Sequence, residues 1–232
     1  MLVKVPFVWR GVTWGDAIEI AGVYVVLALY TWVRPAPTLG GTRAALLAFA
    51  GISYALGHGI HVAANSVHDM LAATHRADSW GLVTLWDERI GHYLVDVGRV
   101  AFAIGLTWAE ADARGPARLD RPDRADRADR GVRSTEPIGP GRWIVFSGAI
   151  AYGFIYFATA VEGQTAPLAL PFCAAFAAWG TWSARHAGRR TGSADAPVRR
   201  FFTVAAWTAL LFFAIWGAVQ RGLPEFTKVG IL

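Results

Sequence analysis

The stretch RAALLAFAGISYALGHGIHVAANSVHDM, residues 43–70, decides the fold class of this chain. It begins as a continuous apolar run that is long enough to cross a bilayer as a helix, which takes roughly 20 residues. Three histidines, an asparagine and an aspartate occupy its end. At about 100° per residue, these five side chains share one helix face. Because an intramembrane polar face is costly against lipid, we expect it to point into a helix bundle.

Bulk composition agrees with a membrane protein. The 232 residues are 54% apolar, include 11 tryptophans and have a mean hydropathy of +0.36. Continuous apolar runs favour helices over the alternating pattern of a barrel. We therefore expect an all-α integral membrane protein, with residues 1–232 forming a single polytopic domain of about six transmembrane helices. The expected spans are 15–33, 43–64, 86–108, 143–161, 166–184 and 201–220, the first acting as its own insertion signal.

Two arginine-rich loops predict the orientation. Residues 110–142 contain eight arginines and residues 185–200 contain five. Basic loops stay on the cytoplasmic side, so residues 65–85 and the end of the fourth span face outward, in a multi-pass inner or plasma membrane protein. The 110–142 loop also contains aspartates that nearly balance its arginines, and no aromatic residue for base stacking. We expect a disordered linker and no nucleic-acid partner.

A second polar face begins in the third span. Glu88 and His92 lie four residues apart, and Asp96 and Arg99 continue the same face. Asp96 and Arg99 are helix neighbours, so we expect them to neutralise each other. The remaining acidic residue of this segment, Asp87, falls about 100° from Glu88 on an α-helix. Asp87 stands three residues after a threonine, a spacing that resembles a helix capping box and predicts a capping role.

The two polar faces are predicted to converge. Spans two and three run in opposite directions and meet at the outer loop, so their polar ends lie at similar depth. Imidazole and carboxylate groups are ligands of first-row metals, and residues one helical turn apart can share an ion. We predict a zinc or iron site in the outer half of the bundle. Its ligands are expected to be His58, His61, His68, His92 and Glu88.

An ion with an open coordination position favours a metal-dependent enzyme, with Glu88 as ligand or general base and with Asn65 and Glu162 orienting ligands or substrate. We expect a lipid-type substrate that enters from the outer leaflet and is hydrolysed or oxidised. The alternatives are a metal-ion or proton transporter, an electron-transfer subunit with haem held by two histidines, and a metal-free polar network. The chain contains no P-loop, nucleophile elbow or HExxH motif.

Overall fold

The structure is a computed structural model. It describes Trp14 and residues 17–18, 20–25, 41–74, 77–112, 140–190 and 196–231. All regular structure in these ranges is helical, with no strand, which confirms the all-α prediction. The predicted span 15–33 is described only in part. Most of the predicted 110–142 loop lies outside the described residues.

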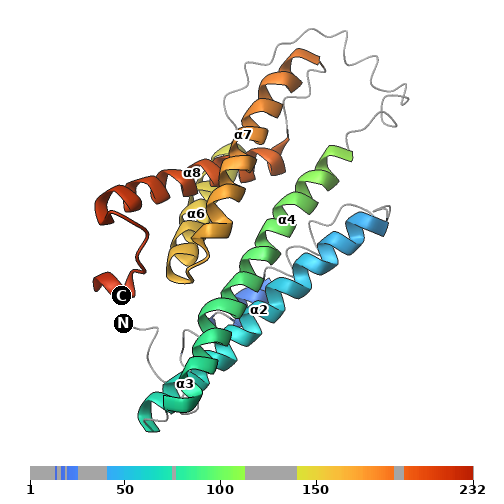
Figure 1. Cartoon of the computed structure of the whole chain (residues 1–232). Coiled ribbons are helices and arrows are strands. Elements are labelled where there is room, and N and C mark those ends of the chain that lie inside the picture. The colour runs from blue at the N-terminus through green and yellow to red at the C-terminus, as the bar shows by residue number, and fades with distance from the viewer. Residues whose placement is uncertain are drawn as a thin grey trace.

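The described helices are shown in Figure 1 in their order along the chain. In order they are α2 (Gly41–Thr74), α3 (Ala77–Thr84), the π-helix η2 (Leu85–Gly91), α4 (His92–Asp112), α6 (Pro140–Glu162), α7 (Ala166–Arg190), α8 (Pro197–Gln220) and the 3₁₀-helix η5 (Thr227–Val229). The segment expected to be a loop, residues 65–85, is largely helical. The physical reason is that alanine and leucine, the residues with high helix propensity in "VAANSV" and "LAA", continue the helix beyond the predicted span.

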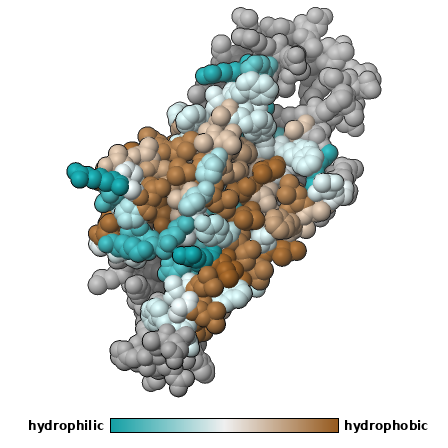
Figure 2. Space-filling model, viewed as in Figure 1, coloured by the Kyte–Doolittle hydropathy of each residue, from teal (hydrophilic) through white to brown (hydrophobic). Residues whose placement is uncertain are grey.

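Three helices in the described part of the chain are long and apolar enough to cross a membrane. Their apolar stretches are Gly41–Val67, Trp143–Glu162 and Pro197–Gln220. Large apolar side chains cover much of the visible molecular surface as a broad brown area (Figure 2). A surface of this kind is stable in hydrocarbon and unfavourable in water, which indicates a membrane protein.

Helices α2 and α4 pack side by side along their length (Figure 1). Three glycines seven residues apart on η2 and α4 lie against α2, namely Gly91, Gly98 and Gly105. A Cβ on Gly98 would lie 2.7 Å from the backbone nitrogen of Tyr54. From the other side, a Cβ on Gly57 would lie 2.5 Å from the backbone nitrogen of Val95. Only glycine permits such a close backbone approach, as is common between membrane helices.

Helices α6, α7 and α8 form a second group whose core is rich in phenylalanine and alanine. Phe157 packs against Phe213 with ring centroids 5.1 Å apart. Ala160, Ala169 and Ala209 are fully buried and allow the helix axes to come close. This group therefore has an apolar core of its own, separate from the contact between α2 and α4.

The turn between α6 and α7 connects the two groups through α4. Arg99 donates from Nη1 to the hydroxyl of Thr159 at 2.6 Å and lies 3.1 Å from Asp96 Oδ1. The hydroxyl of Thr165 donates to the other oxygen of Asp96. The predicted pairing of Asp96 with Arg99 is thus confirmed. The same pair also holds the α6–α7 turn against α4. Arg99 bonds to Thr159 near the end of α6, and Asp96 accepts from Thr165 just before α7.

Candidate metal centre

Three potential metal ligands converge where α2, η2 and α4 meet. His61 comes from α2, Asp87 from η2, and His92 is the first residue of α4. One ligand atom from each lies within 4.8 Å of the others. The ring centroids of His61 and His92 are 4.5 Å apart. Asp87 is buried while both histidines are half-buried, so the group is close to the surface of the protein.

The π-helix explains why Asp87 belongs to this group. Five residues separate Asp87 from His92, which places them about 140° apart on an α-helix. In a π-helix, hydrogen bonds join residues five apart and bring them onto the same side. Asp87 therefore faces the histidines, and its Oδ1 lies 2.6 Å from His61 Nδ1. This separation is within ion-pair distance.

The predicted capping role of Asp87 was wrong. Thr84 has helical dihedral angles, with φ of −58° and ψ of −38°, and its side chain makes no capping hydrogen bond. An N-cap residue has non-helical dihedral angles and stands where a helix begins, next to backbone N–H groups without a partner in the helix. Here the helical path continues from α3 directly into η2, so there are no free backbone N–H groups to cap.

Two glycines determine how closely the ligands approach one another. A Cβ on Gly91 would lie 3.2 Å from the Cβ of His61, so η2 can lie tightly against α2. A Cβ on Gly163, just after α6, would lie 2.5 Å from the imidazole atoms Cγ and Nδ1 of His92. The ring of His92 is therefore enclosed between its own helix pair and the α6–α7 turn.

The donor set suits a first-row metal. Two imidazoles and one carboxylate can hold a zinc ion with a further position open, or a ferrous ion in a facial arrangement. The carboxylate also offsets part of the charge of a divalent ion in a site of low polarity. The group of His61, Asp87 and His92 could therefore hold a metal ion.

The other predicted ligands lie outside this group of three. The ring of His58 packs edge-on against Tyr54, with centroids 4.5 Å apart. Glu88 is half-buried beside Asp87, and Asn65 is half-buried one helical turn beyond His61. The side chain of His68 lies outside the described residues. Metal binding by His58, His68 and Glu88, and the catalytic roles of Glu88 and Asn65, stay predictions.

Glu162 has a structural contact that its position in the sequence did not indicate. Its Oε2 accepts a hydrogen bond from the backbone N–H of Phe226 at 2.8 Å. The segment after α8 thereby folds back toward the end of α6, and Phe226 packs on Phe157 and Trp216. The predicted role of Glu162 toward ligands or substrate stays a prediction beside this contact.

Lys228, in the same C-terminal segment, adds a positive charge to this end of the protein. Its Nζ donates to Glu225 Oε1 at 2.5 Å. This hydrogen bond, with the nearby charges of Glu225, Glu88 and Glu162, raises the pKa of Lys228. The ammonium group therefore stays charged at neutral pH and partly balances the carboxylates on this side.

Comparisons with known proteins found no matching family model, no similar curated protein and no similar solved structure.

Proposed function

We propose that this protein is an integral-membrane metalloenzyme that acts on a lipid-type substrate. The observation that carries the proposal is the convergence of His61, Asp87 and His92 from separate helical segments. A bound zinc or iron ion would polarise a substrate oxygen or activate water for hydrolysis, and iron would also supply oxidative chemistry. Because both histidines are only half-buried, a substrate would reach the ion from the side on which they are exposed.

The membrane arrangement that we propose has about six spanning helices. In addition to α2, α6 and α8, the helices α4, α7 and residues 15–33 would cross the bilayer. Exposed apolar side chains on α4 and α7 support this arrangement, among them Ile104 and Trp179. The basic loops 110–142 and 185–200 would be cytoplasmic, which puts the metal centre on the outer side of a cell membrane.

Exposed tryptophans support a metal centre near one membrane surface. Trp80 and Trp86 are exposed and precede Asp87 closely in the sequence. Trp143, near the start of α6, and Trp182, near the end of α7, are exposed at the helix ends away from the α6–α7 turn. Tryptophans concentrate at the two interfaces between lipid and water. The metal centre would then lie at the level of the lipid head groups, where both a lipid ester or amide and water can reach it.

The side chains near the centre support distinct roles. His61, Asp87 and His92 would hold the ion. Glu88, which is half-buried and next to Asp87 in sequence, would act as the general base that takes a proton from the attacking water. Asn65, one helical turn from His61, would orient the substrate through its amide group.

The observations support the alternative functions less well. A transporter needs a polar path across the membrane, but Asp96 and Arg99 pair with each other and with threonines of the α6–α7 region. Deeper along α4, the contact with α2 is made by Leu47, Ala50 and other apolar residues. For haem, the rings of His61 and His92 would have to lie on opposite faces of the macrocycle, and centroids 4.5 Å apart leave no room for it.

The two adjacent carboxylates provide a sharp test of the proposal. We expect purified wild-type protein to contain about one zinc or iron ion per chain, and Asp87→Asn to lose most of it because a ligand charge is removed. Glu88→Gln is the matched control and should retain the ion. Elemental analysis with an absorption spectrum measures both the amount and the identity of the metal. Equal metal content in wild type, Asp87→Asn and a His61→Ala variant would refute the metal site.

A further inference from the structure

The turn between α6 and α7 contacts two successive helical turns of α4. A Cβ on Gly163 would lie 2.5 Å from the ring of the candidate ligand His92. Thr165, two residues further on, is fully buried and donates its hydroxyl to Asp96, which lies one helical turn beyond His92. The position of this turn therefore determines how much space the ring of His92 has.

Gln164, between these two contacts, has a backbone conformation that the surrounding structure must hold in place. Its φ of 53° lies in the left-handed region, which is unfavourable for a residue with a Cβ. Such a conformation persists where contacts fix the backbone around it. Thr165 fixes one side through Asp96. The other side leads back to Glu162, the last residue of α6.

Glu162 is bonded to the segment that follows α8, residues 221–231. Its Oε2 accepts a hydrogen bond from the backbone N–H of Phe226 at 2.8 Å. Gly163 follows Glu162 directly, so this hydrogen bond ends one residue away from the contact with His92. The segment after α8 is thereby connected to the candidate metal centre through two adjacent residues.

Further contacts fix this C-terminal segment, which turns back after α8 (Figure 1). The ring of Phe226 packs on Trp216 of α8 with centroids 4.7 Å apart, and Trp216 donates from Nε1 to the carbonyl of Pro224 at 3.0 Å. Glu88, beside the candidate ligands, is one of the charges near Lys228 of the segment. The C-terminal segment is therefore held in place close to the metal centre.

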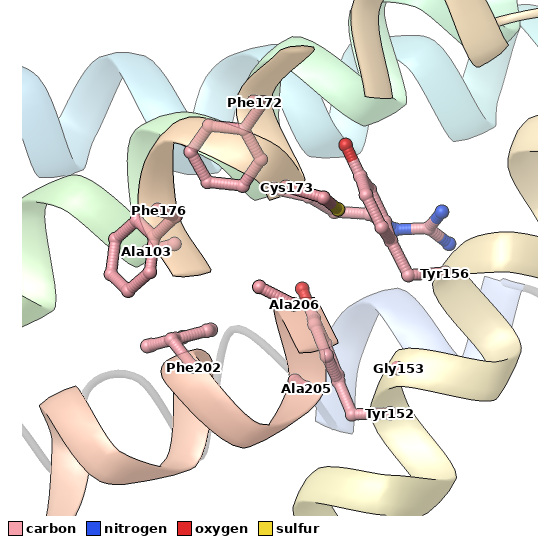
Figure 3. A pocket seen from close by; sticks show the side chains of 11 residues that line it. Ala103, Tyr152, Gly153, Tyr156, Phe172, Cys173, Phe176, Phe202, Ala205 and Ala206 are labelled. Carbon is pink, nitrogen blue, oxygen red and sulfur yellow. The ribbon is translucent and has the colours of Figure 1, made fainter. Parts of the chain in front are cut away.

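The core of the α6–α8 group supports the turn as a packed scaffold. Its pocket is lined mainly by aromatic and small side chains, among them Phe172, Phe176 and Ala206 (Figure 3). The interior has room for about one water molecule, which is too little for a substrate. Close-packed interiors of this kind transmit displacements. A change in the C-terminal segment should therefore reach His92 through the turn.

We propose that the C-terminal segment positions His92 for metal binding, with Glu162 and Phe226 as positioning residues that act through Gly163. This inference rests on the metal centre of the proposed function. The hydrogen bond between Glu162 and Phe226 keeps the turn against the imidazole, and the turn keeps the ring beside His61. Without this bond the ring gains freedom that metal binding must remove, so the affinity for the ion falls.

The first test separates the hydrogen bond from the charge of Glu162. Cobalt(II) is the probe, and competition with a chelator measures its affinity for the purified protein. Glu162→Ala removes the acceptor and should weaken cobalt binding by about 10-fold or more. Glu162→Gln keeps a neutral acceptor of roughly half the strength and should weaken binding by about 3-fold. An equal loss in the two variants would mean that the charge acts on the ion, and would overturn the proposal.

The second test asks whether Glu162 and Phe226 act as one unit. Phe226→Ala removes the packing that holds its backbone N–H near Glu162, so it should weaken cobalt binding about as much as Glu162→Ala. The double variant should bind cobalt no more weakly than either single variant, because both substitutions interrupt the same connection. Losses that multiply in the double variant would contradict the proposal.

Phe176→Leu is the matched control for stability. Phe176 is buried in the α6–α8 group, where its ring packs on Phe172 and Phe202, so this variant should melt at a lower temperature but bind cobalt as wild type does. Phe226→Leu replaces an alanine variant that does not fold and should weaken binding in the same direction. Wild-type affinity in folded Glu162→Ala would overturn this inference alone, whereas wild-type protein that binds no cobalt would overturn the metal centre as well.

Discussion

Gly163 and His92 show how a single residue shapes the candidate metal centre. The imidazole of His92 fills the space where a side chain at residue 163 would begin, since a Cβ there would lie 2.5 Å from the ring. Gly59, on α2 near His61, has no atom within 4 Å of its Cβ position. Comparing an alanine at each of these two positions therefore distinguishes a steric effect on the metal centre from the general effect of replacing a helix-region glycine.

We predict that Gly163→Ala weakens metal binding by about 10- to 100-fold, the size of effect typical of residues that orient ligands. The added methyl group must displace the ring of His92 from its observed position beside His61 and Asp87. Gly59→Ala is the control and should bind metal as wild type does. Competition of each variant with a chelator gives the affinities. Wild-type affinity in Gly163→Ala would mean that the ring of His92 does not need its observed position.

At the scale of elements, the close contact between α2 and the η2–α4 segment brings two of the three ligands, His61 and His92, together. The contact depends on glycines at intervals of seven residues, which stay on one face of a helix that packs along its neighbour. The π-helix then turns Asp87 toward the same face. Helix packing and helix type thus act together, because either one alone would leave the carboxylate away from the histidines.

Gly98→Ala tests the packing of these elements. The new Cβ would lie 2.7 Å from a backbone nitrogen of α2, so the helices must separate, and we expect a loss of about 1–3 kcal/mol in unfolding free energy. Gly81→Ala, on α3, meets no atom within 4 Å and should be neutral or slightly stabilising. Thermal or denaturant unfolding in one detergent measures both variants. Equal stability of both would show that α2 and α4 do not need this approach.

At the scale of the whole molecule, α4 packs against α7 and α8, with Ala103 in their apolar core, and polar contacts also connect the α2–α4 pair to the α6–α8 group. Thr165 is fully buried and donates its hydroxyl to Asp96, while Thr159 accepts from Arg99. The same turn contains Gly163, so these contacts also determine how the second group encloses His92. A substitution that weakens these contacts should therefore also disturb the metal centre.

Thr165→Val should destabilise the protein by about 1–3 kcal/mol, because it deprives a buried carboxylate of a hydrogen-bond donor. Thr107→Val is the matched control: Thr107 is also buried, but its hydroxyl bonds only to the carbonyl of Ala103 in its own helix. The control should therefore lose much less. Unfolding midpoints measure the difference, and an equal loss in the two variants would contradict the proposed connection.

The sequence by itself determined the features that depend on local pattern. Long apolar runs require helices, because backbone groups in lipid must be satisfied within the segment. The pairing of Asp96 with Arg99 follows from a spacing of three residues on one helix. The convergence of His61 and His92 was also predictable, since two antiparallel helices place both near the same end.

Only the tertiary structure decided which carboxylate joins the histidines. A uniform α-helix favours Glu88, whereas the π-helix turns Asp87 toward His61 and His92. A π-helix has no reliable sequence signature, because it depends on how a segment packs against its neighbours. The contact of Glu162 with the backbone of Phe226 joins residues far apart in the chain, so no local pattern predicts it. Local spacing therefore indicated the region of the site, and packing selected the residues that meet there.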